Sequence, residues 1–241
     1  MSRIFAIAVS VLADATRRKV MWAVLAVAAV MSLAIPSLPS YGVGVVEAIF
    51  REFSLAVVYV AAVLITLALC ANRIPGEIER RTIYNVLSKR TARWEYLVGT
   101  WMGIAAVMAA LIAAFIAVDI AIGAFVYHDW MWRLAQGGLA IWFESAILAA
   151  AALAISTRVG PVTVTMGALA FLVVAHSRGV LMLSPMITRF YPSLDMFSII
   201  NPVAHGTGIT WSYAGVMLVA FVGWVLVLMS LATASFASRD L

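Results

Sequence analysis

The stretch Asn72–Gly99 reads NRIPGEIERRTIYNVLSKRTARWEYLVG and lies between two apolar segments, Leu55–Ala71 and Thr100–Tyr127. Of the 241 residues of the chain, 65% are hydrophobic and only 11% are charged. Yet this stretch, here called the polar island, contains six of the 16 Lys and Arg residues. A charged segment between long apolar segments is typical of a membrane protein with a loop in water.

Apolar runs of about 20 residues recur on both sides of the island, and each could cross a hydrocarbon core of about 30 Å. Backbone amides in lipid must be bonded within their own segment, so these runs predict helices. They lack the period-two alternation of an outer-membrane barrel. We expect a single all-α, multi-pass membrane domain over residues 1–241. Its six predicted spans are 20–38, 55–71, 97–127, 134–156, 161–177 and 213–234.

The placement of Lys and Arg predicts the orientation of these spans. With the N-terminus in the cytoplasm, twelve of the 16 basic residues fall inside, and only Arg51, Arg133, Arg178 and Arg189 fall outside. This bias predicts an N-in, C-in protein of the cytoplasmic (inner) membrane of a bacterium. The net charge of +5 is then mostly a topology signal, and no basic surface is left over to bind nucleic acid.

Two segments depart from a simple span. The third predicted span, Leu97–Tyr127, has 31 residues, or about 46 Å of helix, so it must tilt or project from the membrane. The apolar segment Arg178–Trp211 is broken by Pro185, Pro192 and Pro202. We expect re-entrant half-helices here, between spans five and six, packed against protein in the outer leaflet. The alternative is a loop lying flat on the outer surface.

The island itself carries helix signals. Pro75 suits the first turn of a helix, and Glu77 and Glu79 then lie near its positive end. The apolar residues that follow recur at helical spacing. This pattern predicts a short amphipathic helix parallel to the membrane, a turn near Ser88–Thr91 and a second helix that starts near Ala92 and enters the third span. The alternative is that the island only anchors the topology.

Three parts of this region, Glu79-Arg80-Arg81-Thr82-Ile83, Val86-Leu87-Ser88-Lys89 and Tyr96-Leu97-Val98-Gly99 with Arg93 before it and Gly103 after it, resemble the cytoplasmic loop of ABC-2-type transporter permeases. The later segment Pro192–Phe197, with Asn201-Pro202-Val203, resembles the region before the last helix of that family. The sequence departs from the family at three places. Arg81 stands where glycine is common, Lys89-Arg90-Thr91 where a proline often occurs, and Thr100 where lysine is usual.

The resemblance implies an ABC exporter permease that pairs with a second permease copy, as a homodimer or heterodimer, and contacts membrane lipid. It also implies that the island provides a coupling helix for separate ABC ATPase subunits. The residues that this carries over as ATPase-coupling are Glu77, Glu79, Arg80, Thr82, Ile83, Val86 and Leu87. The chain lacks a GxxxxGK[ST] loop, so we expect no enzyme activity and no cofactor in it, with ATP and Mg²⁺ bound by the ATPase.

Three polar residues lie in or at the end of the predicted spans: Asp119, Glu144 and His176. An ionised side chain at the bilayer centre costs about 2.5–3.5 kcal/mol on insertion scales, so such groups face protein or water. They could line a substrate path, pair with Arg133 or Arg178, or lie at an interface. The three histidines show no metal-ligand spacing, so no metal site is expected.

Two further functions remain open from the sequence. The same fold could couple an ABC ATPase to a periplasmic or motility machine without transporting anything. It could also be an ion-coupled secondary carrier, which inverted repeats and a pair of broken helices at mid-membrane would favour. The sequence shows neither of these carrier signs.

Overall fold

The computed structural model describes residues 3–34, 45–71, 73–79, 92–177 and 193–238, and within these ranges every regular element is a helix. The predicted all-α class is confirmed for this part of the chain. The elements in chain order are α1 (Arg3–Arg17), α2 (Lys19–Ala34), α3 (Val45–Ala71), α4 (Arg73–Glu79), α6 (Arg93–Val126), α7 (Leu134–Ser156), α8 (Pro161–Ala175), the 3₁₀ turn η2 (Asp195–Phe197), α10 (Ile200–Ala204) and α11 (Trp211–Ala237).

Four helices are long and apolar enough to cross a membrane: α3 taken together with α4 (Val46–Glu77), α6, α7 and α11. Such helices indicate a membrane protein. Two further apolar helices, Met21–Ala34 in α2 and Pro161–Ala175 in α8, are shorter. The helices lie on the predicted apolar segments, and α7 has the predicted bounds of 134–156.

Helix α6 is the longest, with 34 residues, or about 51 Å at the rise of an α-helix. It begins where the second island helix was expected, because Glu95 caps its first turn. The Glu95 carboxylate accepts a hydrogen bond from the backbone N–H of Ala92 at 2.9 Å. The predicted overlong third helix is therefore present, and it extends into the island.

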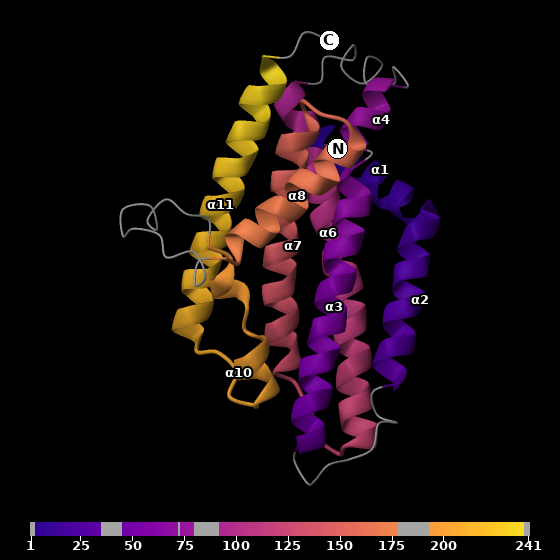
Figure 1. Ribbon diagram of the computed structural model, residues 1–241, viewed down its shortest axis with the longest axis vertical. Helices are drawn as coiled ribbons and strands as arrows, with labels where there is room; N and C mark the ends of the chain where they lie inside the picture. Colours follow the sequence, from indigo (N-terminus) through magenta and orange to yellow (C-terminus); the bar gives the residue numbers. More distant parts are fainter. Residues whose placement is uncertain (1–2, 35–44, 72, 80–91, 178–192, 239–241) are drawn as a thin grey trace.

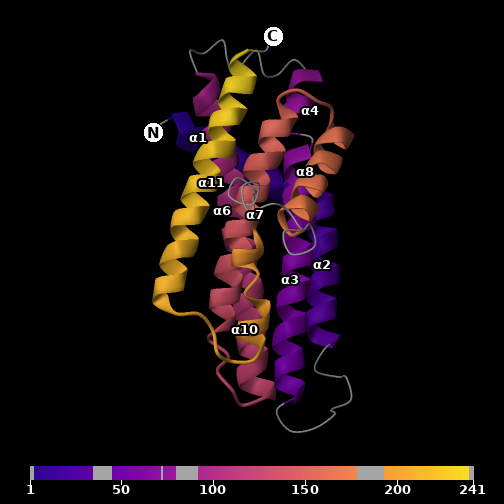
Figure 2. The ribbon, with the colours of Figure 1, turned by 60° about the vertical axis from the view of Figure 1, so that its left-hand side comes forward.

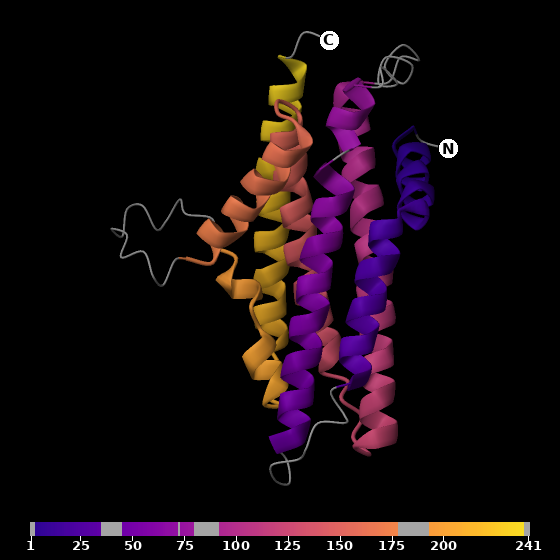
Figure 3. The ribbon, with the colours of Figure 1, turned by 45° about the vertical axis from the view of Figure 1, so that its right-hand side comes forward.

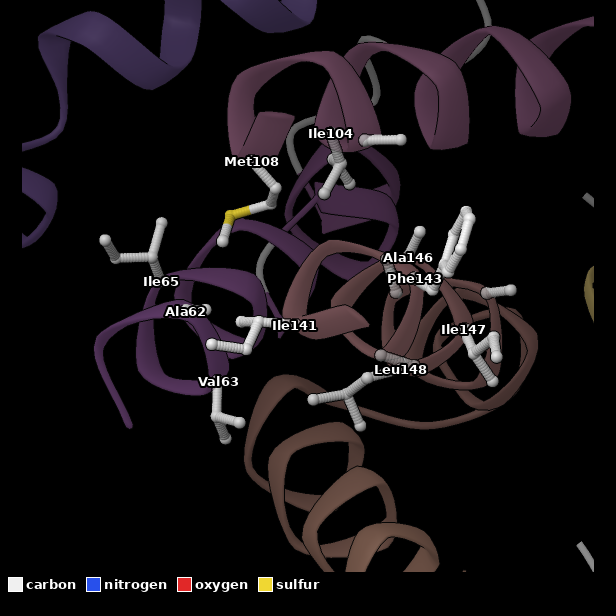
Figure 4. Close-up of a cluster of buried hydrophobic side chains, with 14 of the residues drawn as sticks. Ala62, Val63, Ile65, Ile104, Met108, Ile141, Phe143, Ala146, Ile147 and Leu148 are labelled. Atoms are coloured by element: carbon white, nitrogen blue, oxygen red, sulfur yellow. The ribbon is translucent and has the colours of Figure 1, made fainter. Parts of the chain in front are cut away.

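Helix α7 lies at the centre of the bundle, parallel to α3 and α11 and antiparallel to α6 and α8, and packs against all four (Figures 1 and 2). Its run of small residues, Ala149–Ala152, is buried and allows close approach of its neighbours. Figure 4 shows buried apolar side chains of α3, α6 and α7 that lie close together, among them Ile65, Met108 and Ile141. Two indole N–H groups also join α6 to α7: Trp101 donates to the Ala146 carbonyl at 2.9 Å and Trp142 to the Ala105 carbonyl at 2.8 Å.

Helix α8 covers only the half of the bundle that lies towards the chain termini, while α10 lies in the other half (Figures 1 and 2). Pro161 suits its first turn, and His176 is its C-cap. The N–H of Leu194 donates to the Ala175 carbonyl at 3.1 Å, so the chain returns to the end of α8 before η2 and α10. The predicted re-entrant half-helices in this segment stay a prediction, because Pro185 and Pro192 are not among the described residues. Residues 178–192 lie outside the described residues.

Helix α1 lies beside the start of α6, and α2 then runs along α3 (Figure 3). The face of α1 that includes Val11 and Ala15 is buried, whereas Phe5, Val9 and Leu12 are exposed. Apolar side chains therefore lie both on the face that contacts α6 and on an exposed face of α1. The start of α1, helix α4 and the end of α11 all lie at the same end of the bundle (Figure 1).

Candidate functional site

Only the two ends of the polar island, residues 73–79 and 92–99, lie among the described residues, and together they are here called the base of the island. Of the predicted ATPase-coupling residues, Glu77 is described with its side chain, whereas Glu79 ends helix α4 and its side chain is not described. Lying outside the described residues are Arg80, Thr82, Ile83, Val86 and Leu87. The described part of the coupling region therefore consists of the two helix ends that flank residues 80–91.

A polar cluster joins these two helix ends across the base of the island. The Tyr96 hydroxyl of α6 donates to Glu77 Oε2 of α4 at 2.7 Å. The other carboxylate oxygen of Glu77 lies 3.1 Å from Arg73 Nε. Tyr96 is 1% exposed, so its hydroxyl bonds to a charged group away from bulk water, where such a bond is strong. The entry and exit of the island are thus held together.

Helix α1, and Arg18 between α1 and α2, are attached to the same cluster. Asp14 Oδ2 lies 3.2 Å from both Arg18 Nη2 and Arg73 Nη1. Arg18 Nη1 also donates to the Ala68 carbonyl, near the end of α3, at 2.9 Å. Each of these half-exposed ion pairs is worth only about 0–1 kcal/mol. Their importance is geometric, because one network connects α1, α3, α4 and α6.

The last helix is bonded to the start of α6. Arg93 Nη1 donates to the backbone carbonyls of Phe236 at 2.6 Å and Ala237 at 3.1 Å, at the C-terminal end of α11. The guanidinium also lies over the Phe236 ring, 5.6 Å from its centroid. A cation suits this end of a helix, where the backbone carbonyls carry partial negative charge. Movement of the start of α6 would therefore pull on α11 as well as α4.

The glycine pair of the Tyr96–Gly103 segment is the contact site of α1. A Cβ atom added to Gly99 would lie 2.9 Å from the Ile4 carbonyl oxygen, and one added to Gly103 would lie 2.6 Å from Val11 Cβ. Helix α1 can lie this close to α6 only because these two positions lack side chains. The GxxxG spacing is visible in the sequence, but the sequence does not identify α1 as its partner.

The three polar residues of the spans occupy two separate sites. Asp119 in α6 is fully buried, and the Ser54 hydroxyl of α3 donates to its Oδ2. Its Oδ1 has no hydrogen-bond partner among the described residues. Glu144 and His176 instead come together on α7 and at the end of α8, with Tyr59 of α3 as a third member. Neither site contains Arg133, and Arg178 lies outside the described residues.

Arg51 forms a third cluster at the opposite end of the bundle. Its Nη2 lies 2.6 Å from Asp129 Oδ2 and 3.6 Å from Glu47 Oε2, and its Nη1 donates to the Ala204 carbonyl at 3.3 Å. One guanidinium thus connects α3, the turn between α6 and α7, and α10. A cavity of about 230 Å³ lies beside Arg51 and Asp129.

Replacing Arg51 with methionine is expected to destabilise the fold by about 1–2 kcal/mol, because it removes charged hydrogen bonds worth about 1.5–3 kcal/mol. The expected loss is smaller than the value of these hydrogen bonds because the Asp129 side chain is 46% exposed and stays partly hydrated. The melting temperature of the purified protein in detergent would measure this loss. Arg51→Lys, which keeps the charge but not the forked contacts, should recover only part of it. Equal stability of all three proteins would contradict the assigned role.

Among the described residues, no group of three or more His, Cys, Asp or Glu side chains could hold a metal ion. Cys70 is buried on α3. No protein-family model matches the chain, and no curated protein is significantly similar to it.

Proposed function

We propose that the chain is the membrane-spanning permease subunit of an ABC transporter, which moves a substrate outward using ATP hydrolysed by separate ATPase subunits. The observation that carries this proposal is the cluster at the base of the island. Tyr96, Glu77 and Arg73 hold the two helix ends that flank residues 80–91, and Asp14 adds α1. A force applied to such a loop reaches several helices at once, as coupling requires.

The proposal includes six spans with both chain ends in the cytoplasm. Four long helices and the shorter α2 and α8 supply six apolar segments, and α8 with residues 195–204 would form a broken fifth crossing. The start of α1, helix α4 and the end of α11 lie at one end of the bundle (Figure 1), which agrees with the Lys and Arg bias. Residues 195–204 would then be the re-entrant part, on the outer side.

The docking contact is proposed to use Ile83 and Leu87, together with Glu79 and Thr82. We expect Ile83→Asp and Leu87→Asp each to abolish co-purification of the ATPase that accompanies the tagged wild-type chain, because a carboxylate in an apolar contact remains unpaired. The measurement is the amount of ATPase retained and its stimulated rate of ATP hydrolysis. Trp130→Asp, at an exposed position in the turn between α6 and α7 and far from the island, is the control for simple insertion of a charge.

Two outcomes would decide against this function. Retention and stimulation of the ATPase at wild-type levels by both island variants would remove the proposed docking contact. ATP-independent uptake driven by an ion gradient would favour the second candidate, a secondary carrier, to which the buried Glu144–His176 pair lends support. An ATP-dependent flux assay with the reconstituted complex would separate a transporter from a non-transporting machine subunit.

A further inference from the structure

Three polar side chains from different helices meet in the interior of the bundle. Glu144 of α7 is 3% exposed, and its Oε1 accepts a hydrogen bond from the Tyr59 hydroxyl of α3 at 2.6 Å. His176 Nε2, at the C-cap of α8, lies 3.4 Å from the same Glu144 oxygen. The Tyr59 and His176 rings are in edge contact, with centroids 6.5 Å apart. The three side chains thus form one cluster.

The hydrogen atoms of this cluster can be assigned from its geometry. His176 Nδ1 lies 3.1 Å from the Leu172 carbonyl oxygen, which can only accept a hydrogen bond, so Nδ1 carries a hydrogen. In a neutral imidazole the other nitrogen, Nε2, then has only a lone pair. If Glu144 were also ionised, two acceptors would face each other without a hydrogen between them. The contact is favourable only when one additional proton is present on Nε2 or on the carboxylate.

We propose that Tyr59, Glu144 and His176 form a proton-binding site in the interior of the bundle. The bound proton is shared between Glu144 Oε1 and His176 Nε2, and it fastens the end of α8 to α7 and α3. Loss of the proton leaves a carboxylate facing an imidazole lone pair, and the end of α8 separates from Glu144. Since the contact needs the proton, it forms at low pH and is lost as the pH rises.

The surrounding charges fit this assignment. Among the described residues, the groups that interact electrostatically with Glu144 are His176 and Asp195, while Tyr59 bonds to it directly. Asp195 lies in η2 and accepts a hydrogen bond from the Ser193 hydroxyl at 3.4 Å. The region therefore contains two carboxyl groups and one imidazole, so one bound proton halves its negative charge. This inference does not depend on the ABC transporter proposal, because it involves neither the island nor an ATPase.

Protonation can be followed by ¹⁵N NMR of the full chain, labelled at histidine and reconstituted in lipid nanodiscs. The chain has three histidines, and His176→Gln identifies the signal of interest. We expect the His176 nitrogens to show a pH transition that disappears in Glu144→Gln, because the carboxamide always offers an N–H donor to Nε2 and cannot titrate. A His176 signal that is the same in the wild type and in Glu144→Gln at every pH would overturn the proposal.

The mechanical effect can be measured with a nitroxide spin label at Val173→Cys, an exposed position in the last turn of α8, in a Cys70→Ala background. We expect the label to become more mobile as the pH rises in the wild type, to stay immobile in Glu144→Gln and to be mobile at every pH in Glu144→Leu. A label at Val219→Cys on α11 is the control and should not respond. Equal pH responses in the wild type and Glu144→Gln would contradict the fastening role.

A further variant keeps both proton acceptors, Glu144 and His176, and so tests the site even if the Glu144 variants do not fold. Tyr59→Phe removes only the hydroxyl that bonds to Glu144. It should keep the His176 transition and shift its midpoint, since one hydrogen bond to the carboxylate is lost. An unshifted midpoint would show that Tyr59 does not belong to the site and would overturn the three-residue assignment.

Discussion

Gly103→Leu is expected to destabilise the fold by about 1–3 kcal/mol, the usual range for overpacking a close contact, and to detach α1 from α6. A Cβ atom at this position would lie 2.6 Å from Val11 Cβ and 2.9 Å from the backbone oxygen of Ala8. A backbone atom cannot rotate away, so the whole of α1 has to move. The melting temperature in detergent and tryptic cleavage after Arg17 would report the two effects.

Gly223→Leu on α11 is the matched control, because the same residue change occurs within a helix but nothing lies within 4 Å of the added Cβ. It should be neutral or stabilise the protein by up to about 1 kcal/mol through the higher helix propensity of leucine. If the two variants melted together and were cleaved at the same rate, the contact of α1 with the glycine pair would be wrong.

On the proposed function, Tyr96→Phe should uncouple the chain from its ATPase without weakening their association. The change removes the hydroxyl that holds α6 to Glu77 of α4, while the predicted docking residues on the island stay intact. A hydrogen bond to a charged group is worth about 1.5–3 kcal/mol. If that energy is lost from coupling, the transport-coupled rate of ATP hydrolysis falls about tenfold or more. The measurement compares this rate with the amount of ATPase retained.

Tyr213→Phe provides the control for loss of a tyrosine hydroxyl. The Tyr213 hydroxyl donates to the Met196 carbonyl at 2.8 Å, a bond of similar length at the start of α11 and away from the island. This variant should keep the wild-type coupled rate. A normal coupled rate in Tyr96→Phe would argue against a coupling role for the Tyr96–Glu77 hydrogen bond. A loss of ATPase binding in that variant would place Tyr96 in docking.

The helices could be predicted because a membrane-spanning helix is a run of consecutive apolar residues of a known minimum length. Length and hydropathy predicted α7 at 134–156 and the overlong helix that follows the island. The predicted end of α8 was less accurate, because the span was expected to reach residue 177 whereas the helix ends at Ala175. At the end of α8 the His176 ring lies against the Leu172 carbonyl. Hydropathy alone does not predict that the helix ends at this point.

The polar clusters could not be predicted because their members come from helices far apart in the sequence. Glu144 and His176 were both recognised as unusual, but their pairing and the contribution of Tyr59 depend on how α3, α7 and α8 pack. The bridging of Arg18 and Arg73 by Asp14 likewise requires α1 to lie near the end of α3. Single-sequence periodicity shows which side of a helix is apolar, but not which helix will cover it.

The end of α8 part-way along the bundle leaves backbone groups that need hydrogen-bond partners. A continuous helix bonds its own backbone groups, whereas each helix end leaves several carbonyl or N–H groups without intrahelical partners. The bond from Leu194 to the Ala175 carbonyl satisfies one of these groups, part-way along the bundle (Figure 2). The Leu172, Val173 and Val174 carbonyls accept hydrogen bonds from His176 and Ser177, so α8 can end inside an apolar bundle without leaving an unpaired acceptor in its last turn.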